Sequence, residues 1–335
     1  MMEPFTYARA GDVQDALKRF GERTALLAGG TELLNWMRLG IEHPAHIVDI
    51  SRLQDLKGIE SIPGGSGLRI GALATLNEVA LNPRVANDFP ALSEACLKAA
   101  SAQLRNLASI GGNLLQRTRC PYFRSDEVLP CNRRVPGSGC AARHGINEKH
   151  AIFGWTDDCV AVQPSDPAVA LSALEADIVI ESPRGTRRVS AADFHTLPAD
   201  DRGIRKHNVM DDDELITSIE LPCAMPNSAY LKVRERESYE FAIASAAVGL
   251  ELHGGVIRQA RIALGSVAMR PWRLSGAERN LQGLAVASPD ARRAIEQEFA
   301  AARALSHNAH KIVIARNAAW RALQLAAQRA EGGAA

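Results

Sequence analysis

The sequence lacks the signals of a nucleic-acid-binding, membrane-spanning or secreted protein. Its 39 basic and 38 acidic residues give a formal net charge of +1, and this balance argues against nucleic acid or an anionic membrane as the main partner. No apolar run approaches the roughly 20 residues that a membrane-spanning helix needs. Residues 1–7 contain neither the basic nor the apolar segment of a secretory signal. We therefore expect no membrane insertion and no export signal on this chain.

Several common site motifs are also missing. Neither glycine pair described below is followed by the Gly-Lys-Ser/Thr of a Walker loop, and neither has the Gly-x-Gly-x-x-Gly spacing of a dinucleotide-binding fold. No Ser-His-Asp, HExxH or paired-carboxylate arrangement stands out. We therefore expect no catalytic side chain here, and the common nucleotide folds are not supported.

The sequence does contain alternating helical and strand-like segments, in a composition that is 46% hydrophobic and can fill sizeable cores. The order strand, glycine turn, helix, strand in the first sixty residues predicts a small parallel unit. The hydrophobic periodicity predicts helices at 12–20, 32–39, 76–81, 91–107, 167–176, 290–306 and 308–327, and strands at 24–28, 46–50, 68–72, 177–181, 215–221, 229–237, 246–252 and 256–264.

Turn-rich segments divide the chain. Residues 63–67 (PGGSG) mark one boundary, and residues 222–226, which begin and end with proline, are the best linker. Residues 117–160 lack any sustained period, and a structureless stretch of this length inside a domain is usually functional. We expect these divisions: a domain at 1–222 with subdomains at about 1–60 and 61–222, the loop 117–160 within it, and a C-terminal α+β domain at 227–330.

Two glycine turns suggest a bound diphosphate. Glycine pairs occur in residues 26–33 (LLAGGTEL) and in residues 109–113 (SIGGN). A diphosphate needs backbone N–H donors close to it, and a Cβ atom at the contact positions would block the approach. Thr31 adds a hydroxyl, Asn113 adds an amide, and a helix after the first pair would present its positive end. Either pair alone is more often an ordinary tight turn, so the hypothesis depends on both.

Four of the six cysteines fall within forty residues of the irregular loop, at Cys120, Cys131, Cys140 and Cys159. Six cysteines in a chain of this length do not make a disulfide scaffold, so we expect them to be reduced. Four thiolates can bind a zinc ion or a [4Fe–4S] cluster. The spacing C-x10-C-x8-C-x18-C lacks the close pairs of most structural zinc sites, but the residues alone leave both metals open. Cys96 and Cys223 are expected to be inert packing residues.

Charged residues near these motifs allow more than one interpretation. Asp166 is expected to cap the helix that follows it. Lys232, Arg234 and Arg236 alternate along an expected strand, which is typical of a solvated face. The basic residues of the loop would either neutralise a cluster or dock a partner, and they are Arg117, Arg119, Arg124, Arg133, Arg134, Arg143 and Lys149.

These motifs together resemble the FAD-binding subunit of the molybdenum hydroxylases. This family includes the xanthine dehydrogenase flavin domain and the medium subunit of aerobic carbon monoxide dehydrogenase. The residues that match in order and spacing are 26–33, Arg105-Asn106 leading into 109–113, Ser165-Asp166, Lys232 and the tail 311–316 (KIVIAR). The resemblance implies a two-subdomain FAD-binding domain of the PCMH type, followed by a C-terminal α+β domain of the CO dehydrogenase flavoprotein type.

The cysteine loop resembles a narrower group. Residues 117–124 (RTRCPYFR) and 136–140 (PGSGC) are similar to the flavin subunit of bacterial periplasmic aldehyde oxidoreductases, whose loop holds a [4Fe–4S] cluster. The resemblance therefore favours iron–sulfur over zinc at Cys120, Cys131, Cys140 and Cys159.

The resemblance also implies roles for individual residues toward FAD. The two glycine loops would wrap the diphosphate and ribityl, and Asp166 would bond ribityl or ribose hydroxyls. Ile216 would pack on the isoalloxazine, with Lys232 near its polar edge. The implied cofactor-binding residues are Leu26, Leu27, Ala28, Gly29, Gly30, Thr31, Glu32, Leu33, Ser109, Ile110, Gly111, Gly112, Asn113, Thr118, Asp166, Ile216 and Lys232.

Finally, the resemblance implies a heterotrimer. A large subunit would carry the molybdenum cofactor and a small subunit two [2Fe–2S] centres, and FAD on this chain would pass their electrons to an external acceptor. The alternatives are a stand-alone flavin oxidase of the same fold and a nucleotide-binding module with a structural zinc. The expected compartment is the periplasm, by co-export with a partner, or the cytoplasm.

Overall fold

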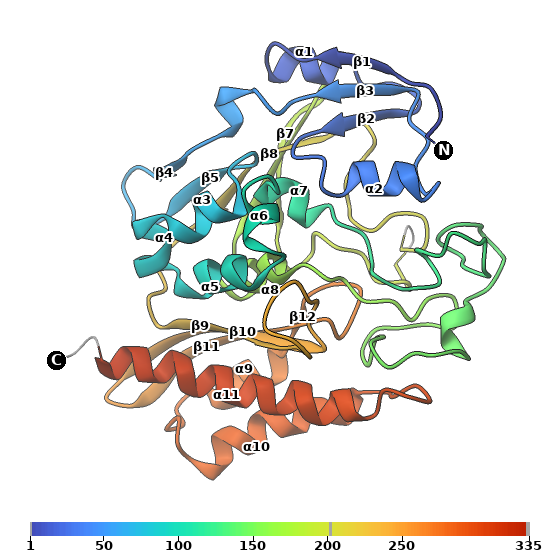
Figure 1. Cartoon of the computed structure of the whole chain (residues 1–335). Coiled ribbons are helices and arrows are strands. Elements are labelled where there is room, and N and C mark those ends of the chain that lie inside the picture. The colour runs from blue at the N-terminus through green and yellow to red at the C-terminus, as the bar shows by residue number, and fades with distance from the viewer. Residues whose placement is uncertain (1, 201–202, 333–335) are drawn as a thin grey trace.

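The computed structural model describes residues 2–200 and 203–332 and arranges them around three β-sheets (Figure 1). A three-stranded sheet lies at the top of the view, a five-stranded sheet in the middle, and a four-stranded sheet below it, covered by the long C-terminal helix. The α+β class predicted from the sequence is confirmed.

The N-terminal sheet has the strand order β1-β3-β2 and is parallel throughout, so the predicted parallel unit is confirmed. The sequence did not indicate β1, because this short strand is mostly exposed and carries no apolar run. Apolar residues of this unit pack against Leu73 and against Leu215, of which Leu215 lies in a strand of the next sheet. The elements are β1 (Thr6–Arg9), α1 (Val13–Lys18), β2 (Thr24–Leu27), α2 (Leu33–Arg38), β3 (His46–Asp49) and the 3-10 turn η1 (Gln54–Leu56).

The middle sheet is antiparallel, in the order β4-β5-β8-β6-β7. Strands β5 and β6 belong to this one sheet, although the cysteine-bearing loop separates them in the sequence. The loop is therefore an insertion into the chain segment that forms the sheet. The elements are β4 (Ile59–Ser61), β5 (Leu68–Gly71), α3 (Leu76–Leu81), α4 (Pro83–Asp88), α5 (Pro90–Lys98), α6 (Ala102–Arg105), α7 (Ile110–Leu114), α8 (Asp166–Ala173), β6 (Asp177–Ser182), β7 (Gly185–Ser190) and β8 (Leu215–Leu221).

The single helix predicted at 91–107 is wrong. The chain leaves helical geometry after α5, because Ala100 adopts a positive φ of 47°. Ser101 then starts α6, since its side chain accepts a hydrogen bond from the N–H of Leu104. The second glycine pair is likewise helical rather than a bare turn. It lies in α7, which Ser109 caps by accepting from the N–H of Gly112.

Residues 117–160 are irregular, as predicted, and project at the right of Figure 1. Their regular structure is limited to the 3-10 turn η2 (Ala141–Arg143) and two isolated bridges, which pair Cys131 with Cys140 and Thr156 with Cys159. Three of the four loop cysteines therefore lie where this loop folds back on itself.

The C-terminal sheet is antiparallel, in the order β12-β11-β10-β9, and α11 packs along it (Figure 1). The helix predicted at 290–306 is shorter than expected, because it ends at Glu298 and gives way to a 3-10 turn. The elements are β9 (Ser228–Val233), β10 (Ala244–His253), β11 (Val256–Gly265), β12 (Trp272–Arg273), α9 (Ser275–Leu281), α10 (Pro289–Glu298), η3 (Phe299–Ala301) and α11 (His310–Gly332).

A buried lysine ties α11 to the cysteine-bearing loop. Lys311 is fully buried, and its Nζ donates to the carbonyl oxygens of Lys149, His150 and Ser266 at 3.1, 2.8 and 2.7 Å. Asn308 adds amide donors to the same stretch of loop at 3.1 Å. The C-terminal domain therefore holds the loop through hydrogen bonds to its backbone.

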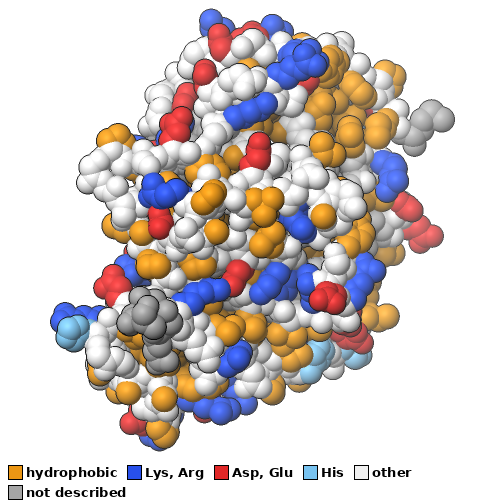
Figure 2. All heavy atoms as spheres, turned by 60° about the vertical axis from the view of Figure 1, so that its left-hand side comes forward, with side chains coloured by type: hydrophobic (Ala, Val, Ile, Leu, Met, Phe, Trp, Pro, Cys, Tyr) orange, Lys and Arg blue, Asp and Glu red, His pale blue; other side chains and the backbone are white. Residues whose placement is uncertain are grey.

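The face drawn in Figure 2 intersperses basic and acidic side chains rather than gathering one sign into a block. Within residues 2–200 and 203–332, no helix is long and apolar enough to cross a membrane. Cys96 is buried, as predicted, but Cys223 is exposed and does not pack in a core. Cys223 follows β8 in the predicted linker, where no apolar layer covers it.

Candidate functional site

The two glycine loops, far apart in sequence, pack directly against each other. A Cβ atom on Gly29 would lie 1.9 Å from the carbonyl oxygen of Leu107, so only glycine permits this approach. Gly30 has a φ of +72°, in the left-handed region that favours glycine. Both glycines of the first loop therefore have a structural role in addition to any role toward a ligand.

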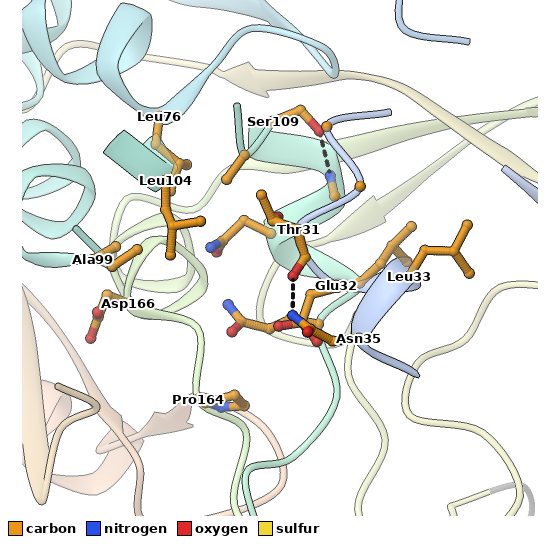
Figure 3. A pocket seen from close by; sticks show the side chains of 18 of the residues that line it. Thr31, Glu32, Leu33, Asn35, Leu76, Ala99, Leu104, Ser109, Pro164 and Asp166 are labelled. Atoms are coloured by element: carbon orange, nitrogen blue, oxygen red, sulfur yellow. Dashed lines mark hydrogen bonds between the residues drawn. The ribbon is translucent and has the colours of Figure 1, made fainter. Parts of the chain in front are cut away.

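The paired loops form one wall of a cavity of about 470 Å³. Figure 3 shows that Thr31, Ser109 and Asp166 reach its edge from three different segments. The predicted cofactor residues that line it are Leu26, Ala28, Gly29, Gly30, Thr31, Glu32, Leu33, Ser109, Gly112, Asn113 and Asp166. The volume falls in the range of small-molecule and cofactor sites.

Hydrogen bonds fix the polar side chains of this wall. Asn35 Nδ2 donates to the carbonyl of Thr31 at 2.9 Å (Figure 3). The hydroxyl of Ser165 donates to Asn113 Oδ1 at 2.6 Å, so the Asn113 amide is held from behind. The loops are therefore fixed before any ligand binds, and the backbone N–H groups of residues 110–113 already donate to acceptors within the chain.

The remaining predicted cofactor residues lie outside the cavity lining. Ile110 and Ile216 are buried in the main hydrophobic core. Gly111 faces Ala72, whose Cβ would lie 2.9 Å from an added Cβ. Thr118 lies at the cysteines, where its hydroxyl accepts from the N–H of Cys120 at 3.2 Å. Also outside the lining are Leu27 and Lys232.

The structure corrects two expectations, that Lys232 lies on a solvated face and that Asp166 caps α8. Lys232 Nζ lies 2.8 Å from Asp166 Oδ2, and its side chain is 1% exposed, so this residue is not on a solvated face. Tyr230 donates its hydroxyl to the other oxygen of Asp166. Ser165, not Asp166, caps α8, because the Ser165 hydroxyl accepts from the N–H of Ala168.

The Asp166 carboxylate therefore joins the two halves of the chain. Burial raises the pKa of Asp166, while the Lys232 ammonium and the Tyr230 hydroxyl act in the opposite direction. Lys232 and Tyr230 lie on β9 of the C-terminal sheet, whereas Asp166 begins α8. Strand β9 ends at Val233, so Arg234 and Arg236 are not part of it, in contrast to the strand predicted at 229–237.

The sequence reasoning missed a large share of the cavity lining. The segment after β9 contributes four residues, and the aromatic ring of Phe241 stacks on the guanidinium of Arg119 at 4.6 Å. Trp36, one turn into α2, could have been expected from its position just after the first glycine loop. The missed lining residues are Asn35, Trp36, Leu76, Ala99, Ala100, Leu104, Ala108, Leu115, Gln116, Arg119, Pro164, Arg236, Tyr239, Glu240 and Phe241.

The loop brings Cys120, Cys131, Cys140 and Cys159 together around one small cavity. Burial raises the pKa of the Cys120 thiol to about 12, and backbone N–H groups of Phe123 and Tyr122 act against this rise. Similar backbone donors reach the sulfurs of Cys131 and Cys140. N–H groups that point at sulfur favour thiolates, and metal binding would supply the charge that deprotonates them.

The basic side chains of the loop are mostly paired inside the chain, which argues against a free basic docking surface. Arg119 and Arg124 both pair with Glu32, and Arg117 pairs with Glu42. Arg143 pairs with Asp157 at 2.9 Å. Lys149 pairs with Glu235 and Glu240, and Arg134 donates to carbonyls. Arg133 differs, because it contacts a cysteine sulfur.

The neighbours of the cysteine sulfurs bear on what the loop could bind. Among the described residues, no three His, Cys, Asp or Glu side chains converge closely enough to hold one ion. His150 Nε2 lies 3.2 Å from Cys120 Sγ, and burial lowers the pKa of His150 to about 4, so its imidazole is neutral near pH 7. A cubane would instead hold the four thiolates apart, because each binds a different iron.

Comparisons with known proteins agree with this arrangement. Residues 3–224 match the family described as FAD binding domain in molybdopterin dehydrogenase, and residues 229–325 match the CO dehydrogenase flavoprotein C-terminal domain. The aldehyde oxidoreductase FAD-binding subunit PaoB of Escherichia coli K12 is 41% identical over 320 residues, which cover 94% of this chain and 96% of that protein.

More distant relatives give the same result. The carbon monoxide dehydrogenase medium chain of Hydrogenophaga pseudoflava is 29% identical over 279 residues, which cover 82% of this chain and 78% of that protein. A solved carbon monoxide dehydrogenase from that organism superposes with a TM-score of 0.75 at 27% identity, over 98% of this chain and 99% of its own. The resemblance noted in the sequence is thus confirmed, and the chain belongs to the FAD-binding subunits of the molybdopterin dehydrogenases, the molybdenum hydroxylase family.

Proposed function

We propose that this chain is the FAD-binding electron-transfer subunit of a heteromeric molybdenum hydroxylase of the aldehyde oxidoreductase type. The observation that carries the proposal is the meeting of both glycine loops on one cavity, in a chain whose whole length matches flavin subunits. Bound FAD would supply the redox chemistry, and the chain would bind, orient and shield it. Its electrons would come from partner subunits and leave to an external acceptor.

Within the cavity, the glycine loops would hold the diphosphate and ribityl of FAD. Residues 29–31 line the cavity beside Ser109, Gly112 and Asn113, and the small residues leave room for the approach of a diphosphate, while the backbone N–H groups of residues 110–113 donate within the chain. Asp166 would accept from ribityl or ribose hydroxyls while Lys232 and Tyr230 hold its carboxylate in place. Ile216 lies in the hydrophobic core and Thr118 lies at the cysteines, so neither would contact FAD in this arrangement.

The four loop cysteines would hold a [4Fe–4S] cluster. They share one cavity, and backbone N–H groups point at their sulfurs. The 41% identity to an aldehyde oxidoreductase FAD-binding subunit supports the aldehyde oxidoreductase type. We place the boundary between the FAD-binding domain and the C-terminal domain at residues 222–227, between β8 and β9.

The partners would be a large subunit with the molybdenum cofactor and a small subunit with two [2Fe–2S] centres. This part of the proposal rests on relatives that are themselves named medium chains of carbon monoxide and glyceraldehyde dehydrogenases. The compartment would be that of the partners, either the periplasm after co-export or the cytoplasm.

Metal content and assembly test the proposal. Cys131→Ser should lower the iron and sulfide content of anaerobically purified protein, while Cys96→Ser, which changes a buried cysteine outside the loop, should not. Co-expression with candidate partner subunits, followed by size-exclusion chromatography, should give a flavin-replete heteromer. A flavin-replete chain that stays monomeric beside its partners and oxidises an organic substrate alone would instead indicate a stand-alone oxidase.

A further inference from the structure

Arg133 lines the cavity that the four cysteines share. Its Nε lies 3.1 Å from the sulfur of Cys159. Its Nη1 and Nη2 are buried and have no hydrogen-bond partner among the residues that the structure describes. A buried charged group without partners costs several kcal/mol. The unused donors of Arg133 therefore indicate an acceptor that belongs in this cavity.

The other arginines of the loop do not share this arrangement. Arg124 donates to Glu32 at 2.9 Å, and Arg143 lies 2.9 Å from Asp157, so each has a carboxylate partner. No carboxylate of the described residues lies within salt-bridge distance of Arg133. Asp158 lines the same cavity, but its contact is with the amide of Asn132.

Arg133 is also the only Lys or Arg among the described residues that line this cavity. Among these lining residues, the formal positive charge is therefore carried by one side chain, which contacts the sulfur of Cys159.

We propose that Arg133 is a charge-compensating residue for the cluster, donating hydrogen bonds from Nη1 and Nη2 to its sulfur atoms and raising its reduction potential. The inference rests on the proposed [4Fe–4S] cluster. A cluster bound by four thiolates carries net negative charge, which increases when it accepts an electron. A fixed guanidinium beside it stabilises the reduced form more than the oxidised form, since the attraction grows with that charge.

The test compares three full-length variants by iron and sulfide analysis and by potentiometric titration of the cluster EPR signal. Arg133→Met should lower the midpoint potential by at least about 59 mV, a tenfold change in the one-electron equilibrium. Arg133→Lys, which keeps the charge, should lower it less. Arg143→Met removes an equal charge that is paired with exposed Asp157, and it should leave the potential unchanged.

Each result decides a separate point. An Arg133→Met protein with full iron and an unchanged potential would overturn the role of Arg133. If that variant loses its cluster, iron retained by Arg133→Lys supports the charge requirement, whereas equal loss in both contradicts it and indicates packing alone. If the unsubstituted protein contains no iron, the proposed cluster itself is wrong.

Discussion

Arg124 donates a hydrogen bond to Glu32 at 2.9 Å, which joins the cysteine-bearing loop to the first glycine loop. Arg119 pairs with the other oxygen of the same carboxylate. These two arginines stand on either side of Cys120 in the sequence, and Glu32 lines the proposed flavin cavity. One partly buried carboxylate is therefore shared by the proposed flavin site and the proposed cluster site, so binding at one should affect binding at the other.

Glu32→Gln should weaken the binding of FAD and of the proposed cluster together. The substitution keeps the shape of the side chain but leaves Arg119 and Arg124 without their counter-charge, which should cost about 1–3 kcal/mol, or roughly 5- to 150-fold in FAD affinity. The measurements are the FAD Kd by fluorescence quenching and iron per chain. Glu42→Gln is the matched control, because Glu42 pairs with Arg117 of the same loop but does not line the cavity. Loss of FAD affinity with full iron retained would contradict the coupling.

Gly29→Ala should separate the two glycine loops. The added Cβ would meet backbone atoms of Leu107, which cannot rotate away, so we expect a loss of stability of about 1–3 kcal/mol or more and weaker FAD binding. Gly11→Ala is the control, since its Cβ would make only an ordinary contact at 3.9 Å with Asp15. Thermal unfolding and flavin content measure both effects. A stable, flavin-replete Gly29→Ala protein would show that the loops do not need this approach.

Lys232→Met should make stability fall as pH rises. Without its ammonium partner, buried Asp166 keeps a proton in the folded chain above 3.8, the ordinary pKa at which the unfolded chain releases it. The folded state then binds more protons, so the free energy of unfolding decreases with pH until the folded pKa is passed. Denaturation at about pH 5 and about pH 8 checks the sign.

The double variant separates charge from packing. Asp166→Asn combined with Lys232→Met should recover part of the stability at about pH 8, because no unpaired buried charge remains. If the double variant is no more stable there than Lys232→Met alone, the buried pair is not the origin of the effect.

Lys311→Met should remove a different pH dependence. Burial lowers the pKa of Lys311 from 10.5 to about 7, so between these values the unfolded chain binds a proton that the folded chain does not. The free energy of unfolding of the unsubstituted protein therefore increases as the pH rises through that window, and the variant lacks this increase. The variant also leaves three backbone carbonyls, two in the loop and one at Ser266, without this donor, at a cost of about 1–3 kcal/mol.

The comparison with Lys149→Met makes this test specific. Lys149 is half-exposed and pairs with Glu235, which raises its pKa. Its replacement should change the pH dependence of stability little between about pH 7 and pH 10.5, the window set by the two pKa values of Lys311. Stability curves for Lys311→Met that run parallel to those of the unsubstituted protein would argue against the assignment.

Local patterns in the sequence were enough to find the two glycine loops and the four cysteines. Glycine pairs and clustered cysteines are signals carried by short stretches of sequence. The structure places the glycine loops around one cavity and the cysteines around another. The spacing alone left open whether the cysteines bind zinc or an iron–sulfur cluster, and the resemblance to a family favoured the cluster. Hydrophobic periodicity also located most long helices and strands to within a few residues.

What could not be predicted depends on contacts between distant segments. Lys232 alternates with other basic residues like a surface strand, but Asp166, 66 positions away, buries it. The cavity wall formed by residues 236–241 carries no local motif, and its place becomes evident only when Phe241 stacks on Arg119. The break at Ala100 was missed because alanine favours helix, whereas the Ser101 cap and the turn to α6 require a positive φ there.

The central claim is that one chain holds both a flavin at the glycine loops and a cluster at the loop cysteines. Quantifying FAD, iron, acid-labile sulfide and zinc in the same anaerobically purified sample tests it most directly. We predict one FAD per chain with about four iron and four sulfide, and a visible spectrum that combines flavin bands with a broad brown shoulder. A colourless protein that contains zinc in place of iron would contradict the account.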